Sequence, residues 1–182
     1  MDEIVRKVQP SADRPGPAVR PDSTHPIAVR LTGEIVENER KRILVAEDVP
    51  KGSSFEIFSD EGEGIGGEER APTPLSYLAA AVAFCLLTQV SQFGKVRQLD
   101  LDGVRIEQTM RFSIQGSWLR GDRRGAGLDL ETDLHVTSGE PPERIRDCVR
   151  AAERACFVVQ SLHPDIASRT RVTLNGRPLD VD

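Results

Sequence analysis

Two cysteines, each set in an apolar stretch, are the residues of this chain that could carry thiol chemistry. Cys85 lies in the run AAAVAFCLL, residues 79–87, and Cys156 lies in AAERACFVV, residues 151–159. A free cysteine is often only a small apolar residue of the core. If two core helices pack with their axes roughly 8–10 Å apart, however, facing cysteines can approach bonding distance. The residues alone leave both interpretations open, an inert pair or a redox pair.

A reactive thiolate at either position would need a nearby positive charge. Apolar surroundings raise the pKa of a thiol, and both cysteines are predicted within helices, away from the favourable N-terminal end. Arg70, which comes just before the first predicted helix, is a candidate cation on sequence proximity, and Glu68 and Glu69 could orient it. A solvated run of charges on a loop explains these three residues at least as well.

The other residues with metal-binding or nucleophilic side chains form no recognisable pattern. Cys148 has no counterpart elsewhere in the chain and is interpreted as an inert core cysteine. The chain has no C-x-x-C pair, and His25, His135 and His163 form no spaced cluster with the cysteines. We therefore expect no metal site. Acyl transfer by a Cys–His pair is disfavoured, because only His163 is near a cysteine in sequence and nothing orients it.

The composition is that of one soluble domain. The chain has 182 residues, a net charge of −5, and 38% hydrophobic residues. The negative charge argues against nucleic acid or an anionic membrane as a partner. The longest apolar run, residues 77–87, is too short to span a bilayer, and the N-terminus has no apolar segment of a secretory signal. We therefore expect a cytoplasmic location.

Turn signals and periodicity divide the chain into an N-terminal arm and one domain. Residues 1–26 carry five prolines in a polar segment and are predicted to be a flexible arm, and residues 27–182 form the domain. Strands are predicted at residues 27–36, 42–48 and 55–61, followed by a helix over 74–93 with Thr73 as cap and Gly94 as stop. A hairpin, a second helix ending near residue 163 and a final strand at 171–176 complete an α+β fold.

Hydrophobic faces within these elements indicate how they pack. In the hairpin and the second helix the apolar positions are Val104, Ile106, Met110, Phe112, Ile114, then Leu128, Leu130, Leu134, Val136, then Ile145, Val149, Ala152, Cys156 and Val159. The first helix is different, because between residues 75 and 90 only Ser76, Thr88 and Gln89 are polar. A helix that is apolar nearly all round must be buried nearly all round, and a chain this short can hardly surround it. The pattern predicts a homodimer with this helix at its centre.

The segment SDEGEGIGGEERAPTPLSYLAAAVAFC, residues 59–85, resembles the OsmC/Ohr family of thiol-dependent peroxidases. An acidic, glycine-containing loop leads through a proline-led segment into an alanine-rich helix that carries a cysteine. Cys156, 71 residues after Cys85 in the second predicted helix, takes the place of the family's second cysteine. The resemblance extends over most of the chain from about residue 27 onwards.

This resemblance implies an OsmC-like fold, with antiparallel sheets around a long buried helix, in an intertwined homodimer whose active sites lie at the interface. It also implies that Cys85 attacks the O–O bond of an organic hydroperoxide and becomes a sulfenic acid. Cys156 would then form a disulfide with Cys85, and a small or protein dithiol would reduce it. No resident cofactor is expected, and the implied role is antioxidant, in the response to oxidative stress.

Two positions depart from the pattern of the family's hydroperoxide reductases. Leu75 stands where a glutamate that holds the activating arginine usually follows the proline, and Phe157 stands where a proline often follows the second cysteine. No arginine of the chain can be matched to the activating one. These departures keep an alternative open, a non-catalytic OsmC-like protein that binds an apolar ligand and whose buried cysteines are inert.

Overall fold

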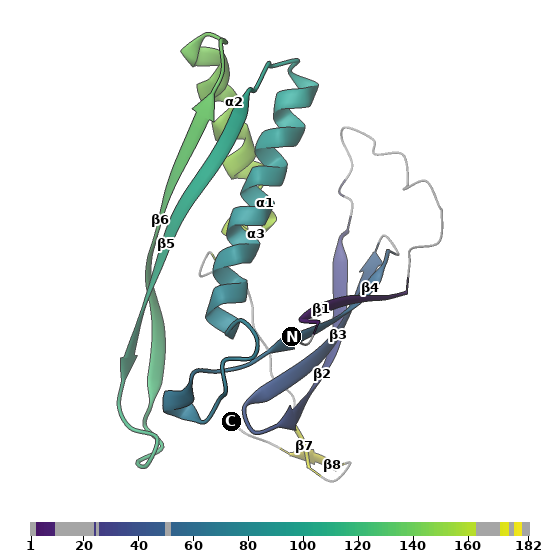
Figure 1. The fold of residues 1–182 in the computed structure, drawn as a ribbon, viewed down its shortest axis with the longest axis vertical. Helices are drawn as coiled ribbons and strands as arrows, with labels where there is room; N and C mark the ends of the chain where they lie inside the picture. The colour runs from purple at the N-terminus through teal and green to yellow at the C-terminus, as the bar shows by residue number, and fades with distance from the viewer. Residues whose placement is uncertain are drawn as a thin grey trace. The chain divides into compact units, whose positions relative to one another are not determined.

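The computed structural model describes residues 3–9, 24, 26–49, 52–162, 172–174 and 177–179. The chain divides into two compact units, Met1–Leu78 and Ala79–Asp182, which are described separately below. The structure consists of antiparallel sheets and helices, so the predicted α+β class is confirmed (Figure 1).

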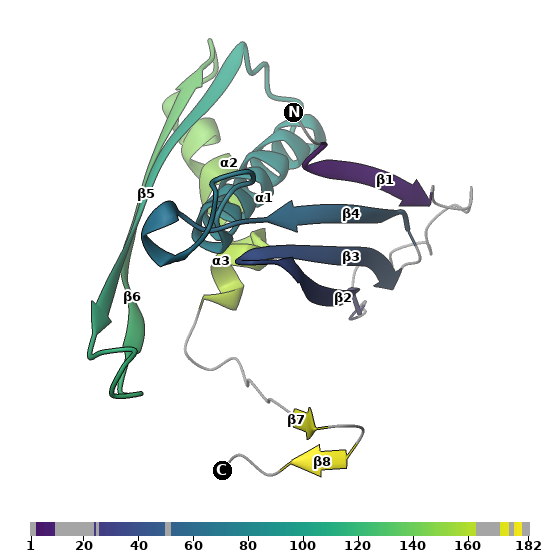
Figure 2. The same ribbon diagram turned by 60° about the horizontal axis from the view of Figure 1, so that its bottom comes forward.

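The N-terminal unit is built on one antiparallel sheet of four strands. They are β1 (Val5–Gln9), β2 (Ala28–Glu37), β3 (Arg40–Val49) and β4 (Ser54–Ser59), in the order β1-β4-β3-β2 (Figure 2). The three predicted strands are confirmed. β1 was missed, because five residues of mixed polarity followed by repeated prolines give little strand signal.

Because β1 pairs with β4, residues within the predicted arm form an edge strand of the sheet. Of the segment 1–26, residues 10–23 lie outside the described part of the chain. The domain boundary at residue 27 stays a prediction.

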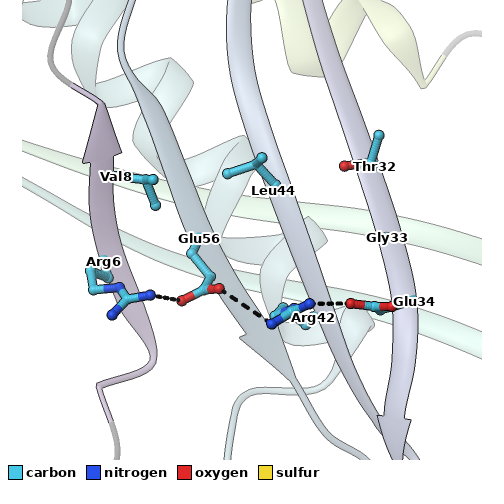
Figure 3. Close-up of a pocket in the computed structure, with 8 residues that line it drawn as sticks. All are labelled: Arg6, Val8, Thr32, Gly33, Glu34, Arg42, Leu44 and Glu56. Atoms are coloured by element: carbon cyan, nitrogen blue, oxygen red, sulfur yellow. Dashed lines mark hydrogen bonds and ion pairs between the residues drawn. The ribbon is translucent and has the colours of Figure 1, made fainter.

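One face of this sheet carries a row of ion pairs across the strands. Glu56 accepts a bond of 2.6 Å from Arg6 and lies 3.9 Å from Arg42, which also pairs with Glu34 (Figure 3). These groups border a hollow of about 410 Å³ lined by Arg6, Val8, Thr32, Gly33, Glu34, Arg42, Leu44 and Glu56. Since each of its charged groups already has a partner of opposite sign, the hollow is not an evident site for a charged ligand.

The opposite face of the same sheet is mainly apolar. Val5, Ile57 and Ile43 are cross-strand neighbours there, and a second row comprises Phe55, Val45 and Leu31. Leu31 is 58% exposed and Ile35, farther along β2, is 71% exposed. This apolar face therefore includes large exposed side chains.

The first helix, α1 (Pro74–Val96), begins where the sequence predicts. The Thr73 hydroxyl accepts the backbone N–H of Ser76 at 3.2 Å, and Pro74 occupies the first turn, where its missing N–H costs nothing. The predicted stop at Gly94 is wrong, because Gly94 lies inside the helix and is buried. The residue in the left-handed conformation is Gln98, with φ 54°.

Only one stripe of α1 is buried in the single chain. Its buried residues are Val82, Leu86, Val90 and Gly94, spaced four apart, whereas Phe84 is 69% exposed. The predicted burial on nearly all sides is therefore not provided by one copy of the chain. Among the described helices, α1 alone is long and apolar enough to cross a membrane by length and composition, a property that the central helix of a soluble protein shares.

The C-terminal unit contains the predicted hairpin, β5 (Gly103–Gln115) and β6 (Arg124–Thr137). Inward-facing neighbours such as Ile106 and Leu134 confirm the alternation along most of its length. Leu128 is an exception, because an irregularity in the pairing beside Arg111 shifts the register, and Leu128 is 61% exposed.

The predicted second helix is two helices, α2 (Pro142–Ala155) and α3 (Phe157–Ser161), separated at Cys156. The core of the unit joins Leu86 and Val90 of α1 with Ala152 and Cys156, and side chains of β5 and β6 pack against it. The predicted final strand corresponds to β7 (Val172–Leu174), which pairs antiparallel with a strand that was not predicted, β8 (Arg177–Leu179).

Candidate active site

Cys85 lies in the fourth turn of α1, next to the buried stripe of that helix. It is partly exposed, while its neighbour Leu86 is a core residue. The side chain of Cys85 packs against the cluster of Leu86, Val90, Ala152 and Cys156. The sequence therefore placed this cysteine correctly, in a helix and at the edge of the core.

Cys156 occupies the junction of α2 and α3 rather than the interior of one helix, which corrects the sequence prediction. Its backbone is extended, with φ −73° and ψ 101°, and it precedes the first residue of α3. Its side chain has no exposed surface. The break arises without the proline that often follows the second cysteine of the family, since Phe157 stands there and is exposed.

The structure brings Cys85 and Cys156 together in one core cluster, a contact that the residues alone left open. Burial raises the pKa of the Cys156 thiol, and the adjacent Cys85 thiol raises it further, whereas the backbone N–H groups of Val158 and Val159 lower it. Both sulfurs are free thiols. Two neighbouring thiols within one core cluster are placed so that a disulfide can form between them.

Cys148 is a buried core residue, as the sequence predicted, and its expected inertness stays a prediction. It is buried, and its thiol donates to the backbone carbonyl of Val90 at 3.8 Å. Burial raises the pKa of Cys148, although Arg97 opposes this shift. It belongs to the packing of α2 against α1.

Arg70, the candidate cation, belongs to the N-terminal unit and is held by carboxylates. Its Nη2 donates to Glu37 at 2.9 Å, and its Nε lies 3.2 Å from Glu68. The hydrogen bond to Glu37 is the main cause of a raised pKa of Arg70. Glu68 is thus in contact with Arg70, while Glu69 instead donates its backbone N–H to the carbonyl of Glu61. Activation of Cys85 by Arg70 stays a prediction.

Asp60 organises the loop that carries Arg70, and the sequence analysis did not single it out. It is 1% exposed, and its carboxylate accepts the backbone N–H groups of Glu61, Glu68 and Arg70 at 2.9, 3.3 and 3.1 Å. Burial raises the pKa of Asp60, but these N–H groups outweigh burial and hold the pKa below its usual value. Its position in the sequence, at the end of a strand and before a glycine-rich loop, could have identified Asp60 as a candidate.

Gln108 is a second polar residue that the sequence analysis missed. It lies on β5 between Ile106 and Met110, on the face that packs inward, and its amide donates to the backbone carbonyl of Ala79 in α1 at 3.0 Å. Gln108 falls on the inward-facing positions of the alternating pattern in β5, so this alternation could have identified it. Its bond ties the first half of α1 to the hairpin.

With this geometry established, comparison with known proteins identifies the family. The sequence profile of OsmC-like proteins matches residues 66–171, more than half of the chain. The chain belongs to the OsmC-like protein family. The matched region contains α1, the hairpin and α2, and therefore both Cys85 and Cys156. No curated protein matches the sequence.

Solved structures show that the fold is that of the OsmC-like proteins. An OsmC-like hydroperoxide resistance protein from Jannaschia sp. CCS1 is 23% identical, with a TM-score of 0.56 over 85% of this chain and 98% of that one. An OsmC-like protein from Mycoplasma pneumoniae is 14% identical, with a TM-score of 0.54 over 79% and 90%. An organic hydroperoxide resistance protein from Legionella pneumophila is 15% identical, with a TM-score of 0.50 over 79% and 93%.

Proposed function

We propose that this OsmC-like protein is a thiol-dependent peroxidase that reduces organic hydroperoxides through Cys85 and Cys156. The observation that carries the proposal is the adjacency of the two thiols within one core cluster. Membership of the family and the hydroperoxide resistance named for two structural neighbours support the choice of substrate.

The difference in burial between the two cysteines supports the assignment of roles. Cys85 is partly exposed, so a substrate can reach its sulfur, whereas Cys156 is enclosed. The Cys85 thiolate attacks one oxygen of the hydroperoxide, the O–O bond breaks, and the alcohol leaves after taking a proton. The Cys156 sulfur then attacks the sulfenic acid of Cys85, and a disulfide and water form.

An external dithiol restores the two thiols by thiol–disulfide exchange and is itself oxidised. The apolar residues Leu86, Val90 and Ile106 around the pair favour a hydroperoxide with an organic group over hydrogen peroxide. No resident cofactor takes part in this scheme.

Steady-state turnover of cumene hydroperoxide with an excess of dithiothreitol tests the assignment of roles. Cys85→Ser removes the attacking sulfur and should reduce kcat/KM by at least about 10³-fold. In a separate reaction without dithiothreitol, hydroperoxide should convert Cys85 of Cys156→Ser to a sulfenic acid that accumulates and can be trapped with dimedone. Cys148→Ser is the matched control, a third buried cysteine outside the pair, and should retain turnover. Full activity of Cys85→Ser would refute the proposal.

A second function is supported by the carboxylates around Arg70. Glu37 and Glu68 pair with this guanidinium, so its charge is already compensated within its own unit. If no other cation activates Cys85, the protein is a non-catalytic OsmC-like module that binds an apolar ligand, with reduced and inert cysteines. Organic hydroperoxide would then leave the mass of the protein unchanged.

We also propose that the protein is a cytoplasmic homodimer. In one chain α1 buries a single stripe and exposes Phe84, and the sheet of the N-terminal unit has a mainly apolar face with Leu31 and Ile35 exposed. A second copy that covers both surfaces would account for the apolar composition of α1.

A further inference from the structure

We infer that the thiol which reduces the Cys85–Cys156 disulfide attacks the sulfur of Cys85, and that Cys156 is the leaving group. This inference rests on the proposed function, because it concerns the second half of the same redox cycle. It identifies the sulfur at which the reductant must dock, which the pairing of the two cysteines does not by itself determine.

Access to the two sulfurs is unequal in the structure. Cys156 has no exposed surface and is enclosed by Leu86, Val90 and Ala152, whereas Cys85 lies at the partly exposed edge of the same cluster. Addition of a second protein chain can only cover more surface, so it cannot make Cys156 accessible. Of the two cysteines, Cys85 is therefore the one with surface from which a reductant can approach the disulfide.

The pKa of the leaving group favours attack at Cys156 instead, but its effect on the rate is smaller than the effect of access. Burial raises the pKa of Cys156, and a thiol of higher pKa departs more slowly from a disulfide. The rate changes by less than the tenfold change in acidity that each unit of leaving-group pKa represents. Attack at Cys156 would instead require the core to open locally, and the open form of a packed core is rarely populated. Access therefore decides which sulfur is attacked.

The electrons balance in two exchange steps. The thiolate of the reductant forms a bond to Cys85 Sγ, the Cys85–Cys156 bond breaks, and Cys156 departs with the electron pair and takes a proton. The second thiol of the dithiol then attacks the sulfur of the reductant in the mixed disulfide and releases the Cys85 thiolate. The dithiol leaves as its own disulfide, and both cysteines are reduced.

A monothiol probe can stop the cycle after the first step. The full-length protein is oxidised with diamide, which forms disulfides without any peroxidase activity, and is then treated briefly with 2-mercaptoethanol. The reaction is quenched with acid, and free thiols are blocked with N-ethylmaleimide. Trypsin separates the three cysteines, because Cys85 lies on peptide 71–95, Cys148 on 147–150 and Cys156 on 155–169.

The expected result is a mercaptoethanol adduct on peptide 71–95, at least about tenfold more abundant than on 155–169, which should carry N-ethylmaleimide. Peptide 147–150 is the internal control and should carry only N-ethylmaleimide. An adduct mainly on Cys156, equal adducts on both, or no adduct on either would overturn the inference, as would the failure of diamide to link the two cysteines. If the adduct forms on Cys85 but hydroperoxide is not turned over, only the proposed function fails.

Discussion

At the scale of single residues, Asp60 shows how one buried charge shapes the loop before the helix of Cys85. A carboxylate that is 1% exposed would be unstable without partners, and three backbone N–H groups of residues 61–70 supply them. One of these groups belongs to Arg70, whose guanidinium also lies 3.9 Å from the same carboxylate. Asp60 therefore fixes the backbone from which Arg70 extends.

Asp60→Asn should lower the melting temperature at pH 7, because a neutral amide accepts these N–H bonds less strongly than a carboxylate. The native pKa of Asp60 lies below its usual value, so its stabilising contribution is complete above that usual value and is lost as the pH falls through the native pKa. The difference between wild type and variant should thus narrow in acid. Thermal unfolding from pH 7 to 2.5 measures it.

Asp102→Asn is the matched control for this change. Asp102 is exposed, so its substitution should have little effect on the melting temperature at any pH in the series. A difference for Asp60→Asn that stays constant into acid would show that the charge of Asp60 is not what stabilises the loop.

The sequence could predict the site residues by type but not their partners. Cys85 and Cys156 were identified from the layout of two cysteines in two helices that resembles the OsmC/Ohr family, because a core cysteine by itself is most often inert. The bonds of Asp60 and the bond of Gln108 to Ala79 join residues whose proximity depends on the tertiary fold. Local pattern contains no information on which distant N–H or carbonyl such a side chain will meet.

At the scale of elements, the helix ends determine where the cysteines lie. α1 ends in a Schellman arrangement, in which Leu99 N–H bonds the carbonyl of Gly94 and Gln98 N–H bonds that of Lys95. Gln98 takes the left-handed conformation that glycine usually supplies, and Gly94 instead packs inside the helix against Leu101. Gly94 therefore marks a close approach of Leu101, and the left-handed end of the helix lies four residues later, at Gln98.

Gln98→Gly should stabilise the protein by roughly 1 kcal/mol, because glycine adopts φ 54° without the steric cost that a side chain incurs. The identical substitution at Gln92, an exposed position within α1, is the control and should destabilise by about 0.5–1 kcal/mol. Urea unfolding measures both changes. Equal effects of the two substitutions would contradict the account of the helix end.

The second helix shows what periodicity can and cannot predict. The stripe of Ala152, Cys156 and Val159 correctly identified the residues that face the core. It could not reveal the break, because a turn from α2 into α3 keeps these side chains on the same side. No glycine or proline marks the junction in the sequence.

At the scale of the whole molecule, the main unusual feature is apolar surface of α1 that one copy of the chain leaves unburied. α1 is apolar nearly all round, yet within one copy it buries only the stripe of Val82, Leu86, Val90 and Gly94. The α+β class and the order of the predicted elements followed from the sequence, whereas the covering of α1 by a partner chain stays a prediction. The predicted homodimer therefore rests on the apolar composition of α1 together with its exposure in one chain.

Phe84→Glu should convert the homodimer to a monomer, because it places a charge on an α1 position that is 69% exposed in the single chain. Sedimentation equilibrium should give about twice the chain mass of 20.0 kDa for the wild type and one chain mass for the variant. Gln115→Glu, at an exposed end of β5, is the control and should remain dimeric. A monomeric wild type would refute the proposed assembly.

The central claim, that Cys85 and Cys156 form a redox pair, is tested most directly by the intact mass of the protein after mild treatment with an organic hydroperoxide. The account predicts that wild type and Cys148→Ser lose two hydrogens per chain, whereas Cys156→Ser gains one oxygen at Cys85 instead. An unchanged mass of the wild type, with both thiols still open to alkylation after unfolding, would contradict it.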